Sequence, residues 1–337
     1  MTVQASPRTR GQHRSSNPRT ERSAYNDRLH TLSVASVEQH FDAFKDIAWD
    51  DPDYAIHADD PRWILPDADP IGATDWYRGL SHEEKMRVGL YRQANVVKVG
   101  LQFEQILIGG LMNYAFRLDN GTAEFRYTTH EATEETHHTQ MFQEFVNRSG
   151  MDVPGGSRFF KTIGPILPLA ARIVPLGFFI GVLAGEEPID HVQKLMLRAD
   201  GIQHPLLQRI MQIHVAEEAR HIGFAHEYVQ QYAPKLNPVE RHFIAMATPV
   251  IMRWLCDEIL KPSKQARRDM GMPDEVFREV FWDAPESRAM LRDLFADVRM
   301  LMESAGLMTF SSRRLWRVLK IDGKPSRFRS QPAAGAA

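Results

Sequence analysis

The sequence predicts an all-α protein built around a four-helix bundle, and three observations support this fold class. Apolar residues recur at helical spacing through long segments, of which residues 204–232 are the clearest example. Long segments with the two-residue alternation of a half-buried strand are absent from the sequence. Two segments that each combine a Glu with a later Glu-x-x-His repeat at the same spacing, which suits two pairs of antiparallel helices.

The two ends of the chain are predicted to lie outside the folded domain. Residues 1–30 carry six Arg and almost no apolar side chains, so we expect a disordered tail there and no secretory signal. Residues 326–337 are expected to form a second disordered tail. The intervening residues 31–325 are expected to form one domain, and clustered Asp and Pro over residues 51–80 indicate irregular surface chain.

Two long helices are expected in the first half of this domain. A capping box formed by Ser81 and Glu84 predicts the start of a helix that ends near Leu118. The second helix is expected over residues 122–146, and the glycine-rich residues 150–157 predict the loop that follows it.

Residues 163–185 form the most apolar segment of the chain. The segment is long enough to span a bilayer, but Arg172 lies in its middle and three Pro interrupt it. We therefore expect two broken, buried helices that contribute to the bundle wall and to a substrate cavity. Beyond residues 204–232, further helices are expected over residues 237–260, and one or two more over residues 273–307.

The strongest functional signal is a repeated set of acidic and imidazole side chains. Residues 134–138 read EETHH and residues 217–221 read EEARH, so the Glu-x-x-His arrangement occurs twice. A carboxylate at an apolar helix precedes each copy, and a shared interval of 31 residues pairs the carboxylate with the Glu of the motif. Facing helices of a bundle that carry such residues form a di-iron carboxylate site. The predicted ligands are Glu104, Glu135, His138, Glu187, Glu218 and His221.

Four residues lie one position away from predicted ligands. The interval of 31 residues selects Glu187 over its neighbour Glu186. The neighbouring residues are expected to be solvated or to orient the ligands. They are Glu134, His137, Glu186 and Glu217.

His214 adds a third imidazole to the second motif. It lies four residues before Glu218, so it shares the helical face that carries Glu218 and His221. As a metal ligand it completes a set of seven residues, whereas the alternative is a core histidine bonded to a backbone carbonyl. The matching position in the first motif is Glu131.

The residue types in this set favour particular metals. Carboxylate oxygens with a few imidazoles suit iron, with manganese as the alternative. The chain has one cysteine, Cys256, which argues against a structural zinc site or an iron–sulfur cluster. Four carboxylates would also neutralise the charge of two ferrous ions.

In their order along the chain, these residues resemble the p-aminobenzoate N-oxygenase family of di-iron arylamine oxygenases, whose sites use four Glu and three His. The resemblance spans roughly residues 80–260, and its most specific part is the His-x-x-x-Glu-x-x-His segment at residues 214–221. It implies a ferritin-like fold with flanking helices, a centre of two iron ions and dioxygen as co-substrate. The implied reaction is oxygenation of a small organic substrate, with N-oxygenation of an aryl amine as its specific form.

Two other functions stay open at this point. A di-iron acyl desaturase or hydroxylase would also use an apolar segment such as residues 163–185, although its six-ligand site lacks the residue corresponding to His214. An iron-binding ferroxidase or storage protein would use similar ligands, but subunits of that class are much shorter.

The expected partners follow from charge and from missing motifs. No Gly-x-Gly-x-x-Gly fingerprint follows a predicted strand, so an external electron donor such as a ferredoxin or reductase is expected. A net charge of −2 gives no reason to expect nucleic acid. The single cysteine fits the cytoplasm, and a homodimer is one expected assembly. Membrane contact is not expected, although loose association stays open for a greasy substrate.

Overall fold

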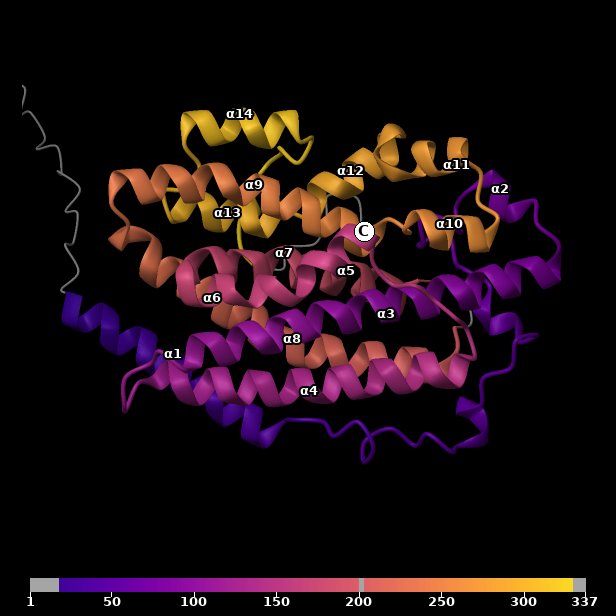
Figure 1. Cartoon of the computed structure of the whole chain (residues 1–337), viewed down its shortest axis with the longest axis horizontal. Helices are drawn as coiled ribbons and strands as arrows, with labels where there is room; N and C mark the ends of the chain where they lie inside the picture. Colours follow the sequence, from indigo (N-terminus) through magenta and orange to yellow (C-terminus); the bar gives the residue numbers. More distant parts are fainter. Residues whose placement is uncertain (1–17, 200–202, 330–337) are drawn as a thin grey trace, which may run out of the picture.

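The computed structural model describes residues 18–199 and 203–329, and Figure 1 shows how their helices are arranged. Within these ranges the chain forms helices, turns and irregular segments without a strand, so the predicted all-α class is confirmed. The long helices are α1 (Pro18–Glu38), α3 (His82–Ala115), α4 (Ala123–Ser149), α7 (Pro175–Arg198), α8 (Pro205–Tyr232) and α9 (Pro238–Leu260).

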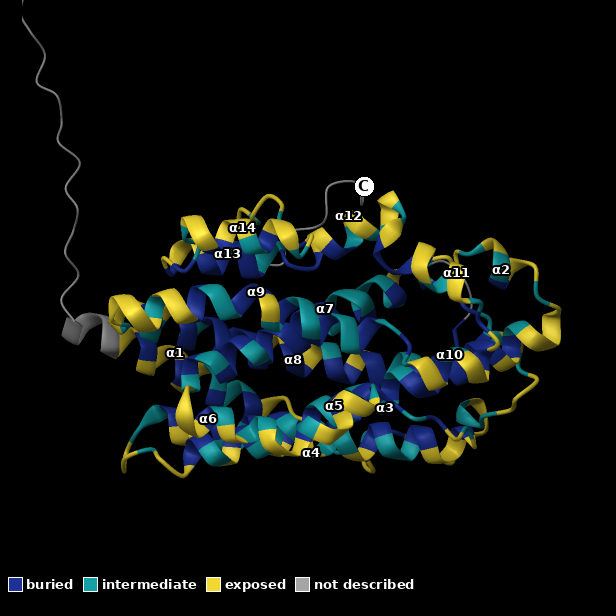
Figure 2. Ribbon diagram, turned by 45° about the horizontal axis from the view of Figure 1, so that its top comes forward, coloured by how far each residue is buried: buried dark blue, intermediate teal, exposed yellow. Residues whose placement is uncertain are grey.

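Four of these helices form the predicted bundle. Helix α3 packs along α4 and α7 packs along α8, while α3 also contacts α7 and α4 contacts α8. Buried residues are concentrated where these helices face one another (Figure 2). The bundle therefore has an interior to which all four helices can contribute side chains.

The first pair of helices begins and ends at the signals expected from the sequence. The side chains of Ser81 and Glu84 each accept a hydrogen bond from the other residue's backbone N–H, at 3.3 and 3.0 Å, which completes the predicted capping box. Helix α4 ends at Gly150, whose φ of 65° lies in the left-handed region that favours glycine. These signals fix where α3 and α4 lie in the sequence.

The apolar segment at residues 163–185 is divided among several elements. Helix α5 (Arg158–Ile163) leads into a 3₁₀ helix (Gly164–Leu169) and then α6 (Ala170–Ile173), and Pro175 is the first residue of α7. Proline suits this position because the first turn of a helix does not need its backbone N–H. Among the described helices, none has the length and apolar character needed to cross a membrane.

The expectation of a disordered tail over residues 1–30 is wrong from Pro18 onward, where α1 begins. Tyr25 and Leu29 are almost completely buried, and α1 packs against α4 and α8. Arg28 forms an ion pair with Glu227 of α8 at 2.8 Å. A helix needs only one apolar stripe to pack, so a high Arg content does not exclude it. The remaining part of the predicted tail, residues 1–17, lies outside the described ranges.

The expected C-terminal tail over residues 326–337 also starts too early. The backbone N–H of Ser326 donates to the carbonyl of Ala296 at 3.0 Å. Arg329 donates to the carbonyl of Ala219 on α8 at 2.7 Å. The chain therefore stays attached to the domain up to this point, and residues 330–337 lie outside the described ranges.

Additional helices flank the bundle, as predicted. Helix α9 packs against α7, and α14 (Phe310–Val318) packs against α9. Residues 273–307 form more pieces than the expected one or two helices because Trp282, with a φ of 85°, and Pro285 interrupt them. The pieces are α11 (Asp274–Arg278), a π-helical turn (Glu279–Asp283), α12 (Pro285–Asp293) and α13 (Ala296–Ser304).

Short elements complete the described chain. Residues 51–80 are largely irregular, as expected, and run along the bundle between α1 and α3 (Figure 1). The short elements are α2 (Asp75–Arg78), α10 (Lys264–Met270) and 3₁₀ helices at Pro52–Tyr54, Pro61–Trp63 and Ala233–Lys235.

Candidate metal centre

Acidic and imidazole side chains from all four bundle helices meet in the interior. Helix α3 supplies one of them, α4 two, α7 one and α8 three. All are buried, with at most 3% of each residue exposed. We call this set the Glu/His cluster, and its members are Glu104, Glu135, His138, Glu186, His214, Glu218 and His221.

The nitrogen and oxygen atoms of the cluster lie close enough together to bind metal ions. Within each of three groups, one ligand atom from every residue lies within 4.8 Å of the others. The groups are Glu135, His138, Glu218 and His221; Glu104, His138 and His214; and Glu186, His214 and Glu218. Because the groups share members, they form one continuous site.

Two carboxylates lie between the two histidines of the Glu-x-x-His motifs. Glu135 approaches Nδ1 of His138 at 3.1 Å with Oε2 and Nδ1 of His221 at 2.7 Å with Oε1. Glu218 Oε1 lies 3.5 Å from Nδ1 of His138 and 3.2 Å from Nδ1 of His221. The motifs therefore interlock, and each motif Glu reaches the histidine of the other helix.

The outer nitrogen of each motif histidine is bonded to a carboxylate from the opposite helix. Nε2 of His138 lies 2.8 Å from Glu217, and Nε2 of His221 lies 2.7 Å from Glu134. A carboxylate can only accept a hydrogen bond, so each Nε2 donates its proton outward. This arrangement directs Nδ1 of both rings into the cluster and fixes their orientation.

Arg220 connects these two outer carboxylates. Its guanidinium donates to Glu134 at 2.9 Å, lies 3.4 Å from Glu217, and donates to the carbonyl of Gln39 at 2.9 Å. Glu217 also accepts the backbone N–H of Phe41 at 3.0 Å. Of the two roles expected for Glu134 and Glu217, solvation or orientation of ligands, their burial and contacts support orientation.

His214 uses the opposite ring nitrogen from the other two histidines. Its Nδ1 lies 2.9 Å from the side-chain oxygen of Gln193, and its Nε2 lies 3.2 Å from Glu104. Burial lowers the pKa of His214 to about 4, so the ring is neutral and can bind a cation. Its partners are side chains, unlike the backbone carbonyl of the alternative interpretation. Gln193 carries no recognisable sequence signal for this role.

The structure brings Glu186 into the cluster, and the expectation for Glu187 is wrong. Glu187 lies 2.7 Å from Nε2 of His226 instead. Adjacent helical residues point about 100° apart, so only one of the two carboxylates can face the cluster. The interval from Glu186 to Glu218 is 32 residues, because the two helix pairs do not share one register.

The carboxylates of the cluster lack partners that a cation would provide. One oxygen each of Glu104, Glu186 and Glu218 is buried and accepts no hydrogen bond. Burial, together with neighbouring carboxylates, raises the pKa of Glu104 and Glu186 well above its usual value. Burying unpaired polar groups costs several kcal/mol each, and bound cations remove that cost. The residues therefore fit a centre of two divalent ions.

Protons balance the charge of the cluster when no cation is bound. Burial alone lowers the pKa of His138, but Glu135 and other carboxylates outweigh burial and raise it to about 10. A metal ion that binds at Nδ1 must displace this proton.

An apolar cavity of about 150 Å³ adjoins the cluster. Residues of α3, α6, α7 and α9 line it, and Glu186 reaches its wall. A smaller void of about 40 Å³ shares Phe103, Gly185 and Glu186 with the cavity and also touches Glu104 and His214. The cavity and the cluster are therefore in direct contact.

Known proteins share the sequence of this region. The family described as P-aminobenzoate N-oxygenase AurF matches residues 22–306, which include every member of the Glu/His cluster. Similar proteins occur in two strains of Mycobacterium tuberculosis, CDC 1551 and H37Rv, and in Mycobacterium bovis. Each is an uncharacterized protein that is 52% identical over 308 residues, covering 91% of this chain and 91% of the relative.

Proposed function

The chain belongs to the P-aminobenzoate N-oxygenase AurF family, and we propose that it is a non-haem di-iron oxygenase acting on a small organic substrate. Membership in this family points to an oxygenase and confirms the predicted ferritin-like fold. The specific reaction that we propose is N-oxygenation of an aryl amine. The observation that carries the proposal is the apolar cavity, because it reaches the buried Glu/His cluster at Glu186.

The Glu/His cluster would hold two iron ions, with manganese as the alternative metal. Its four carboxylates match the charge of two ferrous ions, and its imidazoles suit iron. Bound iron would supply the activation of dioxygen for transfer of an oxygen atom.

The protein's own residues hold the ligands in place and exclude water. Glu134 and Glu217 fix the two motif histidines, and Gln193 fixes His214. The ring of Phe142 lies against His214 with a centroid distance of 5.2 Å, and His138 lies on the same ring at 6.3 Å. This aromatic cover keeps water away from the imidazoles and so strengthens electrostatic interactions inside the site.

The proposed reaction requires electrons from outside the chain. Conversion of an aryl amine to a hydroxylamine replaces one N–H bond by N–O–H, and the second oxygen atom leaves as water. The balance needs two electrons and two protons for each dioxygen. A ferredoxin or reductase is therefore part of the proposal.

The size of the cavity favours a small substrate over a long acyl chain. A cavity of about 150 Å³ in another protein binds benzene. This match supports an arylamine oxygenase and weakens the acyl desaturase alternative.

Labelled dioxygen provides the test. The iron-loaded protein would be supplied with a chemical reductant, a panel of anilines and ¹⁸O₂, and products would be analysed by mass spectrometry. We expect a product that carries one ¹⁸O atom on nitrogen. Oxygen consumption without any labelled product, accompanied by ferric iron accumulating beyond the cluster's capacity, would identify a ferroxidase instead.

A further inference from the structure

The walls of the apolar cavity restrict the charge of any compound inside it. Glu186 is the only charged side chain among the described residues that line the cavity, and the indole of Trp254 is the only other one with a polar atom. Removing a carboxylate from water without a cationic partner costs several kcal/mol. A carboxylated ligand would also face the like charge of Glu186. The cavity therefore disfavours acidic ligands.

A glycine opens the space that a ligand would fill. Gly181 lines the cavity from α7, and a Cβ atom placed there would meet no atom within 4 Å. Any larger residue at this position would extend into the cavity. Together with the volume of about 150 Å³, this opening suits one aromatic ring.

The polarity of the cavity also sets the direction of a ligand. One oxygen of Glu186 is buried and accepts no hydrogen bond, so it is the position where an amine N–H gains a partner. Ile251 and Trp254 of α9 line another part of the cavity and offer apolar contacts to a ring substituent.

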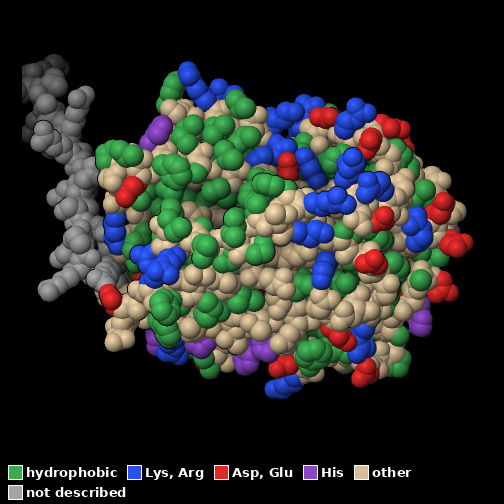
Figure 3. Space-filling model, in the orientation of Figure 1, with side chains coloured by type: hydrophobic (Ala, Val, Ile, Leu, Met, Phe, Trp, Pro, Cys, Tyr) green, Lys and Arg blue, Asp and Glu red, His purple; other side chains and the backbone are tan. Residues whose placement is uncertain are grey.

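The protein surface outside this wall is apolar as well. Ile173 on α6 is 75% exposed and Val250, next to the lining residue Ile251, is 48% exposed. Apolar side chains gather on the face shown in Figure 3, over the region where Figure 1 places α6 and α9. A neutral compound loses little on passing such a surface.

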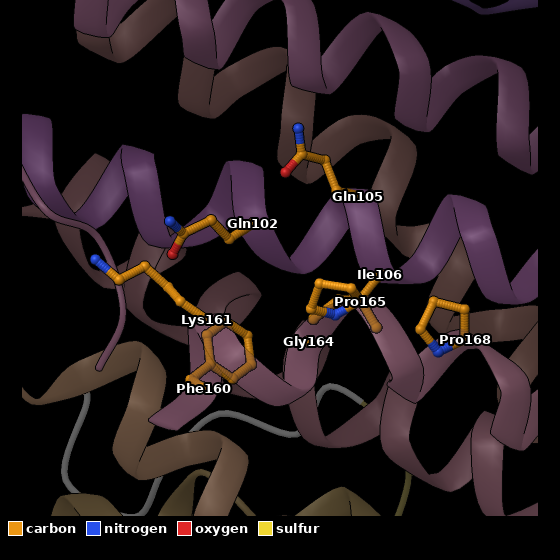
Figure 4. A pocket seen from close by; sticks show the side chains of 8 residues that line it. All are labelled: Gln102, Gln105, Ile106, Phe160, Lys161, Gly164, Pro165 and Pro168. Atoms are coloured by element: carbon orange, nitrogen blue, oxygen red, sulfur yellow. The ribbon is translucent and has the colours of Figure 1, made fainter. Parts of the chain in front are cut away.

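Cationic chemistry is found in a separate, outer pocket. This pocket of about 390 Å³ lies between α3 and the segment around α5, and Gln102, Gln105 and Lys161 line it (Figure 4). It shares Ile106 with the apolar cavity, so the two spaces lie on opposite sides of one side chain. A carboxylate would find its cation at Lys161, outside the cavity.

We propose that the apolar cavity binds a neutral, single-ring aryl amine with its amino group toward Glu186, and that it rejects aminobenzoates. This inference rests on the proposed oxygenase function and names its substrate class. The discriminating feature is the pairing of one carboxylate at the inner wall with otherwise uncharged surroundings.

Binding measurements test this proposal without relying on turnover. Titration calorimetry on the full-length, iron-loaded protein under anaerobic conditions would compare para-ethylaniline with para-aminobenzoate. We expect para-ethylaniline to bind at least about tenfold more tightly, which corresponds to about 1.4 kcal/mol. Equal or tighter binding of para-aminobenzoate would overturn the substrate class while leaving the oxygenase function intact.

A variant that fills the cavity shows where the amine binds. Gly181→Leu should weaken para-ethylaniline binding by roughly tenfold or more, and Gly181→Ala should have a smaller effect. Ala216→Leu is the matched control, because Ala216 is exposed on α8 and the same bulk is added there. Circular dichroism and iron content would show that each variant is folded and loaded.

The remaining outcomes separate the two proposals. Binding that is unaffected by Gly181→Leu but lost in Lys161→Ala would place the ligand in the outer pocket and overturn the inference. Tight, Gly181-dependent binding of para-ethylaniline without any oxygenated product would support the binding site and contradict the oxygenase function.

Discussion

The helix pair α3–α4 and the helix pair α7–α8 carry the same motif but contribute differently to the Glu/His cluster. The first pair supplies three members and the second supplies four, because α8 adds His214. The position on α4 that corresponds to His214 is Glu131, which is completely buried. Both oxygens of Glu131 lack a hydrogen-bond partner, whereas both nitrogens of His214 have side-chain partners. The two pairs thus share a framework and differ in the extra imidazole.

This comparison teaches that the shared part and the unshared part serve different purposes. The motif carboxylates and the outer partners Glu134 and Glu217 occur in both pairs and build the site. His214 occurs in one pair, next to Glu186 at the cavity wall. The asymmetry therefore lies on the side from which a substrate would approach.

Exchanging the two adjacent carboxylates of α7 should have the largest effect on the comparison. Glu186→Ala removes a cluster member, so we expect the loss of about one of two bound irons per chain. Glu187→Ala should retain both irons, because Glu187 faces His226. Metal analysis of both variants after anaerobic iron loading checks this. The opposite order of iron loss would restore the register expected from the sequence.

Removing the extra imidazole should abolish activity more than metal binding. In His214→Ala the other cluster members still supply all four carboxylates, so we expect most of the iron to remain. Substrate oxygenation should fall by at least about tenfold, because an imidazole ligand is lost beside the cavity. Iron content and the rate of labelled product formation are the measurements.

Glu131→Gln is the matched control for this variant. Burial raises the pKa of Glu131 well above its usual value, so its carboxyl is protonated and glutamine resembles it closely. We expect iron content and oxygenation to stay unchanged. Equal losses in the two variants would show that the two positions are equivalent after all.

Changing the outer carboxylates should have the smallest effect, and the same effect in both pairs. Glu134→Gln and Glu217→Gln each weaken the anchor of one motif histidine, so iron affinity should fall by about 10- to 100-fold. Competition with a chelator measures the affinity. Glu227→Gln is the control, because Glu227 pairs with Arg28 away from the cluster. A loss confined to one pair would contradict the shared framework.

The sequence contained the bundle and most of the cluster because both depend on local spacing. Helical periodicity identified α8, and the repeated Glu-x-x-His placed four cluster members on facing helices. The choice between Glu186 and Glu187 depended on how α7 is rotated against α8. A change of one residue turns a side chain by about 100°, and no local pattern determines that rotation.

Helix α1 shows a different kind of error. Tyr25, Leu29 and Ser36 are buried at spacings typical of one helical face, so a usable signal was present. The high Arg content of residues 1–30 outweighed it in the prediction. Gln193 could not be found in this way, because its role exists only where α7 meets α8.

Anaerobic titration of the metal-free protein with ferrous iron tests the central claim most directly. The account predicts that uptake stops at two irons per chain, as the shared groups of the Glu/His cluster require, and that the melting temperature rises on loading. No uptake, preferential binding of a single zinc ion, or uptake far beyond two irons would contradict a di-iron centre in this bundle.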